Sequence, residues 1–481
     1  MKRKFVTNLI LLVILNLLIK PFWIFGIDRV VQNVVGAESY GMYFALLNFS
    51  WLLNILLDVG ITNYNNRNIA RHRFLLQKHL PNIVGLRLWL AVGYAAVCFG
   101  TGAIIGYDSV QLHLLIFLVI NQFLVSFTLY LRSNLSALMY FRTDSLLSVL
   151  DRTFMIIICS ILLFTNITGG VFRIEWFVYA QTAAYVLTAL ITLAILISKT
   201  GRFSIKSNCR FSLVFLKKSY PYALLILLMA FYNRIDSVLL ERLLPDPTGK
   251  QEAGIYAQAF RLFDAVSMFG ALVAGLLLPI FARMIKKREP IEPIIELSVS
   301  LLFVPSVIVA VSSLLYNHDI MGWLYHSHIN DSANIFGLLM VGFTGVCMTY
   351  IFGTLLTASG RIRELNIMAA CGMVFNVAIN LLLIPHFQAL GAATVSMLTQ
   401  LLTGVAQIVI SIRLLKLKIQ KKYILKLLLF IVIIVILGFL SNLTDNRIAG
   451  YCALILTSLL IAFAAKLINL RDLYGIITDK E

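Results

Sequence analysis

The chain has 481 residues, of which 60% are apolar and only 13% charged, and its mean hydropathy is +0.90. Soluble domains are about 45 to 50% apolar, so this composition excludes an ordinary soluble protein and predicts one that crosses a membrane many times. The formal charge of +18 does not indicate a nucleic-acid partner, because most basic residues fall in short loops between apolar runs. We expect the lipid bilayer, and no nucleic acid, to contact these loops.

Fourteen apolar runs approach the length of about 20 residues that a helical membrane span requires. The even number places both ends of the chain on the same side of the membrane. The predicted fold is therefore an all-α polytopic membrane protein. The fourteen runs are, approximately, 6–27, 41–62, 82–105, 111–133, 146–165, 176–198, 219–241, 253–282, 293–316, 333–358, 365–385, 389–412, 424–441 and 448–465.

The distribution of Lys and Arg predicts the orientation of these spans. If the N-terminus is cytoplasmic, 29 of the 40 Lys and Arg residues lie in cytoplasmic loops and only five lie in the opposite loops. Loops rich in Lys and Arg stay in the cytoplasm by the positive-inside rule. Both termini are therefore predicted to be cytoplasmic.

The chain contains an internal repeat. Gly41-Met-Tyr43 opens the second predicted span and Gly254-Ile-Tyr256 opens the eighth, while Gln181 in span 6 and Gln400 in span 12 are 219 residues apart. Transporters are commonly built from two such repeated halves. The repeat predicts pseudo-symmetric six-helix lobes with a terminal helical pair. The predicted parts are an N-lobe of residues 1–200, a C-lobe of residues 215–415, and the last two spans with a cytoplasmic tail, residues 420–481.

Four charged residues, Arg234, Asp236, Arg261 and Asp264, lie inside the apolar runs of spans 7 and 8. A charge at membrane depth costs roughly 2.5 to 3.5 kcal/mol on insertion scales and usually faces a wet cavity. Lys20, Arg234 and Arg261 each lie seven or eight residues from the predicted outer end of their span, so we expect one cationic patch suited to phosphate oxygens. An alternative for Arg261 is structural pairing with Asp264, three residues away.

Polar stripes mark spans 6 and 12. In span 12, Ser396, Gln400, Thr403 and Gln407 are four, three and four residues apart, which places them on one helical face. Gln181 begins a similar stripe in span 6. One interpretation is a hydrophilic cavity that holds sugar hydroxyls, and the other is hydrogen bonding between helices. The sequence leaves both open.

Four further charges, Arg87, Arg132, Arg152 and Asp58, lie close to the predicted cytoplasmic ends of their spans. Long side chains at such positions usually reach the aqueous interface by snorkelling. We therefore interpret these charges as interfacial, with a functional role as the alternative.

Neither a metal site nor a nucleotide site is predicted. The outer loop at 317–332 holds three histidines without regular ligand spacing, and the chain lacks G-x-x-x-x-G-K-[ST], H-E-x-x-H and G-x-S-x-G motifs. We expect no catalytic residues, no metal and no cofactor, and hence a secondary transporter that is not an enzyme. Coupling to a proton or a sodium ion is left open.

Several segments resemble the polysaccharide transporter family of the multidrug/oligosaccharidyl-lipid/polysaccharide (MOP) flippase superfamily, the bacterial flippases of O-antigen and capsule repeat units. The segments that carry the likeness are Val35-Gly-Ala-Glu-Ser-Tyr-Gly-Met-Tyr43, Leu57-Asp-Val-Gly60, Asn68-Ile-Ala-Arg71, Leu383-Ile-Pro-His386 and Gly391-Ala-Ala393.

The resemblance implies a two-lobed protein of the bacterial cell membrane that moves undecaprenyl-pyrophosphate-linked oligosaccharide to the outer leaflet by alternating access. Polysaccharide polymerase machinery is an implied partner. Tyr256-Ala-Gln-Ala-Phe-Arg-Leu262 is similar to the eighth span of lipid II flippases, in which an arginine at the Arg261 position lines the cavity. Lys20 is the single cation in span 1, where those flippases carry arginines.

Other functions remain alternatives. A lipid II-type flippase or a MATE-like multidrug antiporter would use the same scaffold, although Lys20, Arg234 and Arg261 would repel a cationic drug. A membrane glycosyltransferase or polymerase would place acidic residues in sizeable outer loops, and the loops here are short. The sequence does not identify the glycan or the oligomeric state.

Overall fold

The computed structural model is helical throughout nearly all of the part of the chain that it describes, which confirms the predicted all-α fold. The helices divide into two compact units, residues 1–254 and residues 255–481. The described residues are 14–62, 65, 75–165, 171–201, 209–417, 420–444, 446–465 and 467.

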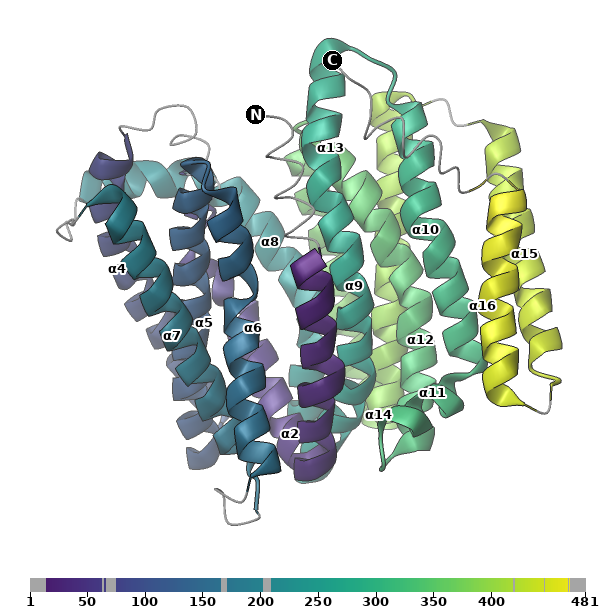
Figure 1. Ribbon diagram of the computed structural model, residues 1–481, viewed down its shortest axis with the longest axis horizontal. Coiled ribbons are helices and arrows are strands. Elements are labelled where there is room, and N and C mark those ends of the chain that lie inside the picture. The colour runs from purple at the N-terminus through teal and green to yellow at the C-terminus, as the bar shows by residue number, and fades with distance from the viewer. Residues whose placement is uncertain are drawn as a thin grey trace. The chain divides into compact units, whose positions relative to one another are not determined.

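In the first unit, α5 packs against α7, and α2 packs against both α5 and α8 (Figure 1). The described part of the first helix, from residue 14 onward, includes one π-helical turn, η1. The elements are the helix of residues 14–22, η1 (Trp23–Asp28), α2 (Arg29–Leu52), η2 (Asn54–Leu57), α4 (Leu75–Ile105), α5 (Ser109–Ala137), α6 (Phe141–Phe164), α7 (Ile174–Thr200), α8 (Cys209–Leu243) and the start of α9 (Thr248–Lys287).

In the second unit, α12 packs between α14 and α10, and the pair formed by α15 and α16 packs beside α10 (Figure 1). A small apolar core around Val304 and Ile308 of α10 and Ile434 of α15 joins this pair to the unit. The elements after α9 are α10 (Glu292–Leu315), α11 (Asn317–Leu324), α12 (Ile329–Met348), η4 (Thr349–Gly353), α13 (Thr354–Ala358), α14 (Ile362–Leu415), α15 (Lys421–Ser441) and α16 (Arg447–Ala464).

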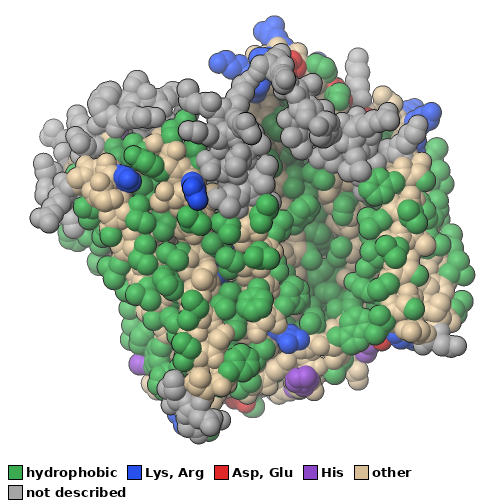
Figure 2. Space-filling view, viewed as in Figure 1, with side chains coloured by type: hydrophobic (Ala, Val, Ile, Leu, Met, Phe, Trp, Pro, Cys, Tyr) green, Lys and Arg blue, Asp and Glu red, His purple; other side chains and the backbone are tan. Residues whose placement is uncertain are grey.

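Eleven helices among the described residues are long and apolar enough to cross a membrane, and hydrophobic side chains cover most of the visible flanks (Figure 2). The 54-residue α14 contains two predicted spans, because Gln388 at φ 50° and ψ −134° breaks it three residues after Pro385. The multi-pass membrane architecture is therefore confirmed, while the number of fourteen spans stays a prediction.

The first helix continues beyond the end of the first predicted span. It passes Asp28 without a stop, because the π-helical turn of η1 leads directly into α2, and it breaks at Gly36, where φ is 80° and ψ is 168°. Glycine adopts this conformation because it has no β-carbon. The predicted outer boundary of the membrane near Asp28 stays a prediction.

The two glycines of the repeated motif bring α2 and the start of α9 into direct backbone contact. A β-carbon on Gly41 would lie 1.8 Å from the carbonyl oxygen of Lys250, and one on Gly254 would lie 1.9 Å from that of Ala37. Small residues permit such close helix crossings in membranes. The first compact unit therefore includes α8 and the start of α9, and the predicted lobes of residues 1–200 and 215–415, which rest on the sequence repeat, stay a prediction.

Candidate functional site

Lys20 is half-buried in the first span and faces α6. The amide of Asn16, one helical turn earlier, donates a hydrogen bond of 3.0 Å to the Ser148 hydroxyl on α6. The ring of Trp23, almost one turn later, lies 5.6 Å from the guanidinium carbon of Arg152. Lys20 therefore lies on a stretch of helix that is fixed against α6 on both sides.

Arg152 lies deeper in its span than the sequence predicts. The helix α6 begins at Phe141 instead of residue 146, so Arg152 is eleven residues from one end and twelve from the other. At 1.5 Å per residue this is about 16 to 18 Å from either end. Snorkelling to the interface is therefore the wrong interpretation for Arg152, whose side chain is 28% exposed.

Arg234 and Asp236 lie on α8 with different surroundings. Arg234 is half-buried, its Nη1 donates to the Asn48 side-chain oxygen at 3.4 Å, and its guanidinium lies 5.3 Å from the Trp51 ring. Asp236 is only 1% exposed. Both residues therefore contribute to the packing of the first unit, and the substrate role predicted for them stays a prediction.

Arg261 and Asp264 are half-buried on the part of α9 that belongs to the second unit. The common depth predicted for the three cations stays a prediction, and their distances to the nearest helix break or end differ. Lys20 is sixteen residues before the break at Gly36, Arg234 is nine residues before the end of α8, and Arg261 is thirteen residues after the start of α9. These spacings correspond to about 24, 14 and 20 Å.

The stripe in span 6 is buried on α7. Gln181 is 4% exposed and its amide donates a hydrogen bond of 2.7 Å to the Tyr43 hydroxyl on α2. The Thr188 and Thr192 hydroxyls donate to carbonyl oxygens four residues earlier in their own helix. This arrangement favours hydrogen bonding within the bundle over a hydrophilic cavity.

The stripe in span 12 is also buried, on the second arm of α14. Gln400 is 4% exposed and Gln407 is 1% exposed. A β-carbon on Gly345 of α12 would lie 2.4 Å from the Gln400 carbonyl oxygen, and one on Gly353 would lie 2.6 Å from the Gln407 side-chain oxygen. These glutamines therefore lie at a close helix contact, and their predicted substrate role stays a prediction.

Arg87 and Asp58 form a buried ion pair, whereas the sequence pattern predicted that both lie at the membrane–water interface. Arg87 is only 1% exposed, its guanidinium forms a salt bridge with Asp58, and its Nη1 donates to the Ser126 hydroxyl at 3.0 Å. The ring of Tyr130 lies 4.7 Å from the guanidinium carbon. Snorkelling is therefore wrong for Arg87, because neighbouring helices enclose it.

A second polar network joins the end of α8 to the start of α5. The Gln111 amide donates to the Glu241 carboxylate at 2.6 Å, and Arg242 donates back to the Gln111 side-chain oxygen at 2.8 Å. The guanidinium of Arg242 lies 4.3 Å from the Tyr107 ring. Burial and the Glu241 charge raise the pKa of the Tyr107 phenol, which therefore stays protonated.

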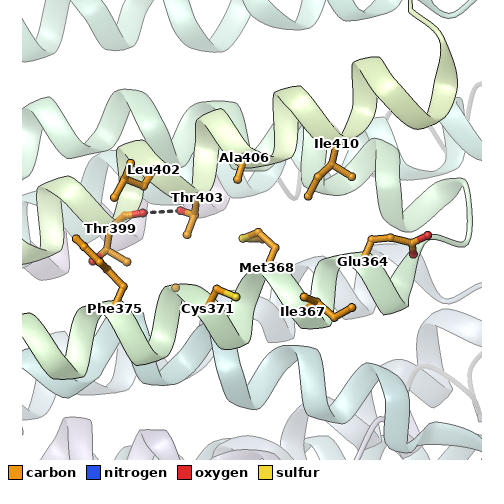
Figure 3. A pocket seen from close by; sticks show the side chains of 11 residues that line it. Glu364, Ile367, Met368, Cys371, Phe375, Thr399, Leu402, Thr403, Ala406 and Ile410 are labelled. Carbon is orange, nitrogen blue, oxygen red and sulfur yellow. Dashed lines mark hydrogen bonds between the residues drawn. The ribbon is translucent and has the colours of Figure 1, made fainter.

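A cavity of about 510 Å³ lies between the two arms of α14 (Figure 3). Ile367, Phe375 and Leu402 line it together with Thr399 and Thr403. Both threonine hydroxyls donate to carbonyl oxygens of their own helix, as the dashed line for Thr403 marks in Figure 3. The cavity therefore suits a hydrocarbon chain better than a glycan.

Sequence reasoning missed Arg152 and Arg87 as charges of the bundle interior. Arg87 and Arg152 lie five and six residues from the predicted starts of their spans at residues 82 and 146, so the sequence pattern placed both near the interface. Helical spacing gave one usable signal: Asn16 and Lys20, like Ser148 and Arg152, are four residues apart and share a face. The sequence does not show that these two helix faces pack against each other.

Comparisons with known proteins agree with this architecture. A family model described as polysaccharide biosynthesis protein matches residues 5–285. An uncharacterized membrane protein of Methanocaldococcus jannaschii is 22% identical over 477 residues, which cover 93% of this chain and 92% of that protein.

Two solved structures show the same fold. The lipid II flippase MurJ in an inward closed conformation superposes with a TM-score of 0.76 at 13% identity, over 97% of this chain and 100% of that chain. An inward-facing multidrug resistance MATE family transporter of the MOP superfamily superposes with a TM-score of 0.63 at 16% identity, over 79% of this chain and 91% of that chain. The predicted MurJ-like and MATE-like fold is confirmed. Since the family model covers more than half of its 481 residues, the chain belongs to the polysaccharide biosynthesis protein family.

Proposed function

We propose that this protein is a flippase that moves undecaprenyl-pyrophosphate-linked oligosaccharide repeat units from the cytoplasmic to the outer leaflet of a bacterial cell membrane. The family match over residues 5–285 carries the proposal. The fold shared with a lipid II flippase over 97% of the chain supports a lipid-linked substrate. The protein acts as a secondary transporter and performs no covalent chemistry on the glycan.

The membrane potential favours this direction of transport. Moving one charge across the membrane is worth about 2.3 kcal/mol per 100 mV. A dianionic pyrophosphate leaving a negative cytoplasm therefore gains up to roughly twice that energy. Transport needs no ATP in this scheme.

Translocation of a fluorescent lipid-linked oligosaccharide in vesicles that contain the purified protein tests the proposal. Protein-dependent exposure of the label on the opposite leaflet, without ATP, is the expected result. The MATE-like fold makes multidrug antiport the second candidate. Transport of a cationic dye, with no transport of the lipid-linked oligosaccharide, would replace the proposal by that function.

Arg261 is our first candidate for contact with the pyrophosphate, because it is half-buried on a membrane-spanning helix. A hydrogen bond to a charged group contributes roughly 1.5 to 3 kcal/mol, so Arg261→Ala should weaken substrate binding about 10- to 150-fold. Arg261→Lys should restore part of the loss, because the charge stays while the planar fork is removed.

The measurement is binding and translocation of the labelled lipid-linked oligosaccharide by equal amounts of inserted protein. A merely structural partner of Asp264 would behave differently from a ligand contact. Wild-type translocation by Arg261→Ala, or full recovery in the Arg261→Ala, Asp264→Ala double variant, would remove Arg261 from the substrate site.

We also propose that both termini are cytoplasmic, on the strength of the Lys and Arg distribution. Reporter domains fused after Thr165, at the end of α6, and after Thr200, at the end of α7, should report opposite sides of the membrane. An alkaline phosphatase and a fluorescent protein serve as the two reporters. Signals from the same side would contradict the proposed topology.

A further inference from the structure

The two arms of α14, before and after the break at Gln388, line their cavity with the same helical pattern. On each arm the lining positions are i, i+3, i+4, i+7 and i+11, which follow one face of a helix. Each stripe rises eleven residues, or about 17 Å at 1.5 Å per residue. The residues at these positions are Glu364, Ile367, Met368, Cys371 and Phe375 on the first arm and Thr399, Leu402, Thr403, Ala406 and Ile410 on the second.

The two ends of the cavity differ. Phe375 and Thr399 lie at one end, and Glu364 and Ile410 lie at the other (Figure 3). At the first end, the Asn376 amide donates a hydrogen bond of 3.3 Å to the Thr399 hydroxyl and so joins the two arms. The arms run in opposite directions, so the start and the end of α14 both lie at the second end.

The side of the cavity is open and apolar. Ile367 is 57% exposed and Leu402 is 52% exposed, so a hydrocarbon chain can enter from the outer surface of these helices. Each leaflet of a hydrocarbon core of about 30 Å is about 15 Å deep, which is close to the cavity length of about 17 Å. One acyl chain of a single leaflet therefore fits the cavity, whereas an undecaprenyl chain is much longer.

The end beside Glu364 and Ile410 carries positive charge. Arg361 lies three residues before Glu364, and its Nη1 is 3.4 Å from the Glu364 carboxylate. Arg413 is three residues after Ile410, on the same face of the second arm, and is exposed. Within the part of the chain that the structure describes, Arg413 forms no salt bridge. Since Arg361 neutralises Glu364, the charge of Arg413 is left for a ligand.

We propose that the cavity of α14 holds one acyl chain of an anionic phospholipid, whose phosphate lies beside Arg413 and Arg361. Basic residues between membrane helices on the cytoplasmic side attract anionic head groups. A guanidinium also offers two parallel N–H donors to one phosphate. This lipid site is separate from the substrate residues proposed above, and it does not depend on the flippase function because the bilayer itself supplies the ligand.

Native mass spectrometry of the full-length protein in detergent, with added phosphatidylglycerol, measures the affinity for the first bound lipid. Ala406→Phe places a ring in the cavity and should weaken this binding about tenfold, which corresponds to about 1.4 kcal/mol. Val405→Phe is the matched control. Val405 is adjacent on the same arm, is 57% exposed and does not line the cavity, so this variant should bind like the wild type.

The head group is tested with two lipids that have the same chains. The wild type should bind phosphatidylglycerol more tightly than phosphatidylcholine, which has no net charge. Arg413→Ala should remove this difference, and Arg413→Lys should restore part of it because the positive charge remains. Arg363→Ala removes an exposed cation that lies on a different face of the first arm, and it should leave the difference unchanged.

Cys371 gives an independent measurement on the unchanged protein, because its thiol lines the cavity and is accessible. Phosphatidylglycerol should protect Cys371 from N-ethylmaleimide in detergent. Cys452 on α16 is also exposed and lies outside the cavity, so its reaction should be unchanged. Mass spectrometry of the digested protein reports both thiols in one sample.

Three results would overturn the proposal. They are equal binding by the Ala406→Phe and Val405→Phe variants, equal affinity of the wild type for the two phospholipids, and a Cys371 thiol that phosphatidylglycerol does not protect. Protection of Cys371 by undecaprenyl phosphate and not by phosphatidylglycerol would assign the cavity to the chain of the transported lipid instead.

Discussion

Two cation sites of the first unit differ in how deeply they are buried. Arg87 is enclosed at 1% exposure and is neutralised by Asp58. Lys20 and Arg152 are partly exposed, and each has the other cation among its neighbours. A buried arginine depends on its acidic partner, whereas the partly exposed ion pair of Arg152 with Asp151 is screened by its surroundings. The depth of a cation in the membrane therefore does not by itself distinguish these two kinds of site.

The largest effect that we predict concerns Arg87. Removing one partner of a buried ion pair costs about 3 to 5 kcal/mol, and the low end applies because the Asp58 side chain is 24% exposed. Arg87→Met should therefore lower the free energy of unfolding by about 3 kcal/mol. Thermal unfolding in detergent measures this loss.

The same assay sharpens the comparison between the two sites. Asp58→Asn in the Arg87→Met background should restore part of the stability, because no unpaired carboxylate remains. Arg152→Ala should lower the stability less than Arg87→Met does, since the ion pair of Arg152 with Asp151 is partly exposed. An unfolding temperature of Arg87→Met that equals the wild-type value would break the distinction between the two sites.

An intermediate effect is expected at Asp151. Its carboxylate forms an ion pair with Arg152 at 3.8 Å, and both side chains are about a quarter exposed. Partly exposed ion pairs contribute about 0.2 to 1 kcal/mol, so Asp151→Asn should lower the free energy of unfolding by no more than about 1 kcal/mol. Thermal unfolding in detergent beside the wild type measures the change. A loss as large as that of Arg87→Met would remove the distinction between the two ion pairs.

The smallest effect concerns an uncharged contact between helices. Gln181→Leu removes the hydrogen bond of 2.7 Å to Tyr43. Hydrogen bonds between membrane helices average about 0.6 kcal/mol, so the unfolding temperature should fall only slightly, and substrate affinity should stay unchanged. A large loss of affinity without a change in stability would instead support the hydrophilic cavity in which the sequence pattern allowed Gln181 to lie.

The repeated motifs illustrate what the sequence can predict about the fold. Gly41 and Gly254 are recognisable as equivalent residues from their spacing and neighbours alone. The structure adds that α2 and α9 touch through these glycines, with Lys250 and Ala37 as the opposing backbone. The sequence pattern identifies the two small residues. Which helix packs against each of them is decided by the tertiary structure.

The candidate site divides in the same way. The sequence by itself determined the class of protein, because hydropathy adds up along the chain and 60% apolar residues in runs of about 20 can only be accommodated in a membrane. It also identified Lys20 and Arg261 as unusual charges, because ionised side chains are rare inside apolar membrane spans.

Only the tertiary structure decided how these charges are used. The first helix continues past Asp28 to Gly36, because a π-helical turn leads directly into α2. Arg87 is sealed by Asp58 from another helix, and Lys20 lies beside Arg152 because Asn16 and Trp23 set the register against α6. Electrostatic energy depends on the distance between charges in space, and sequence order does not specify that distance between separate helices.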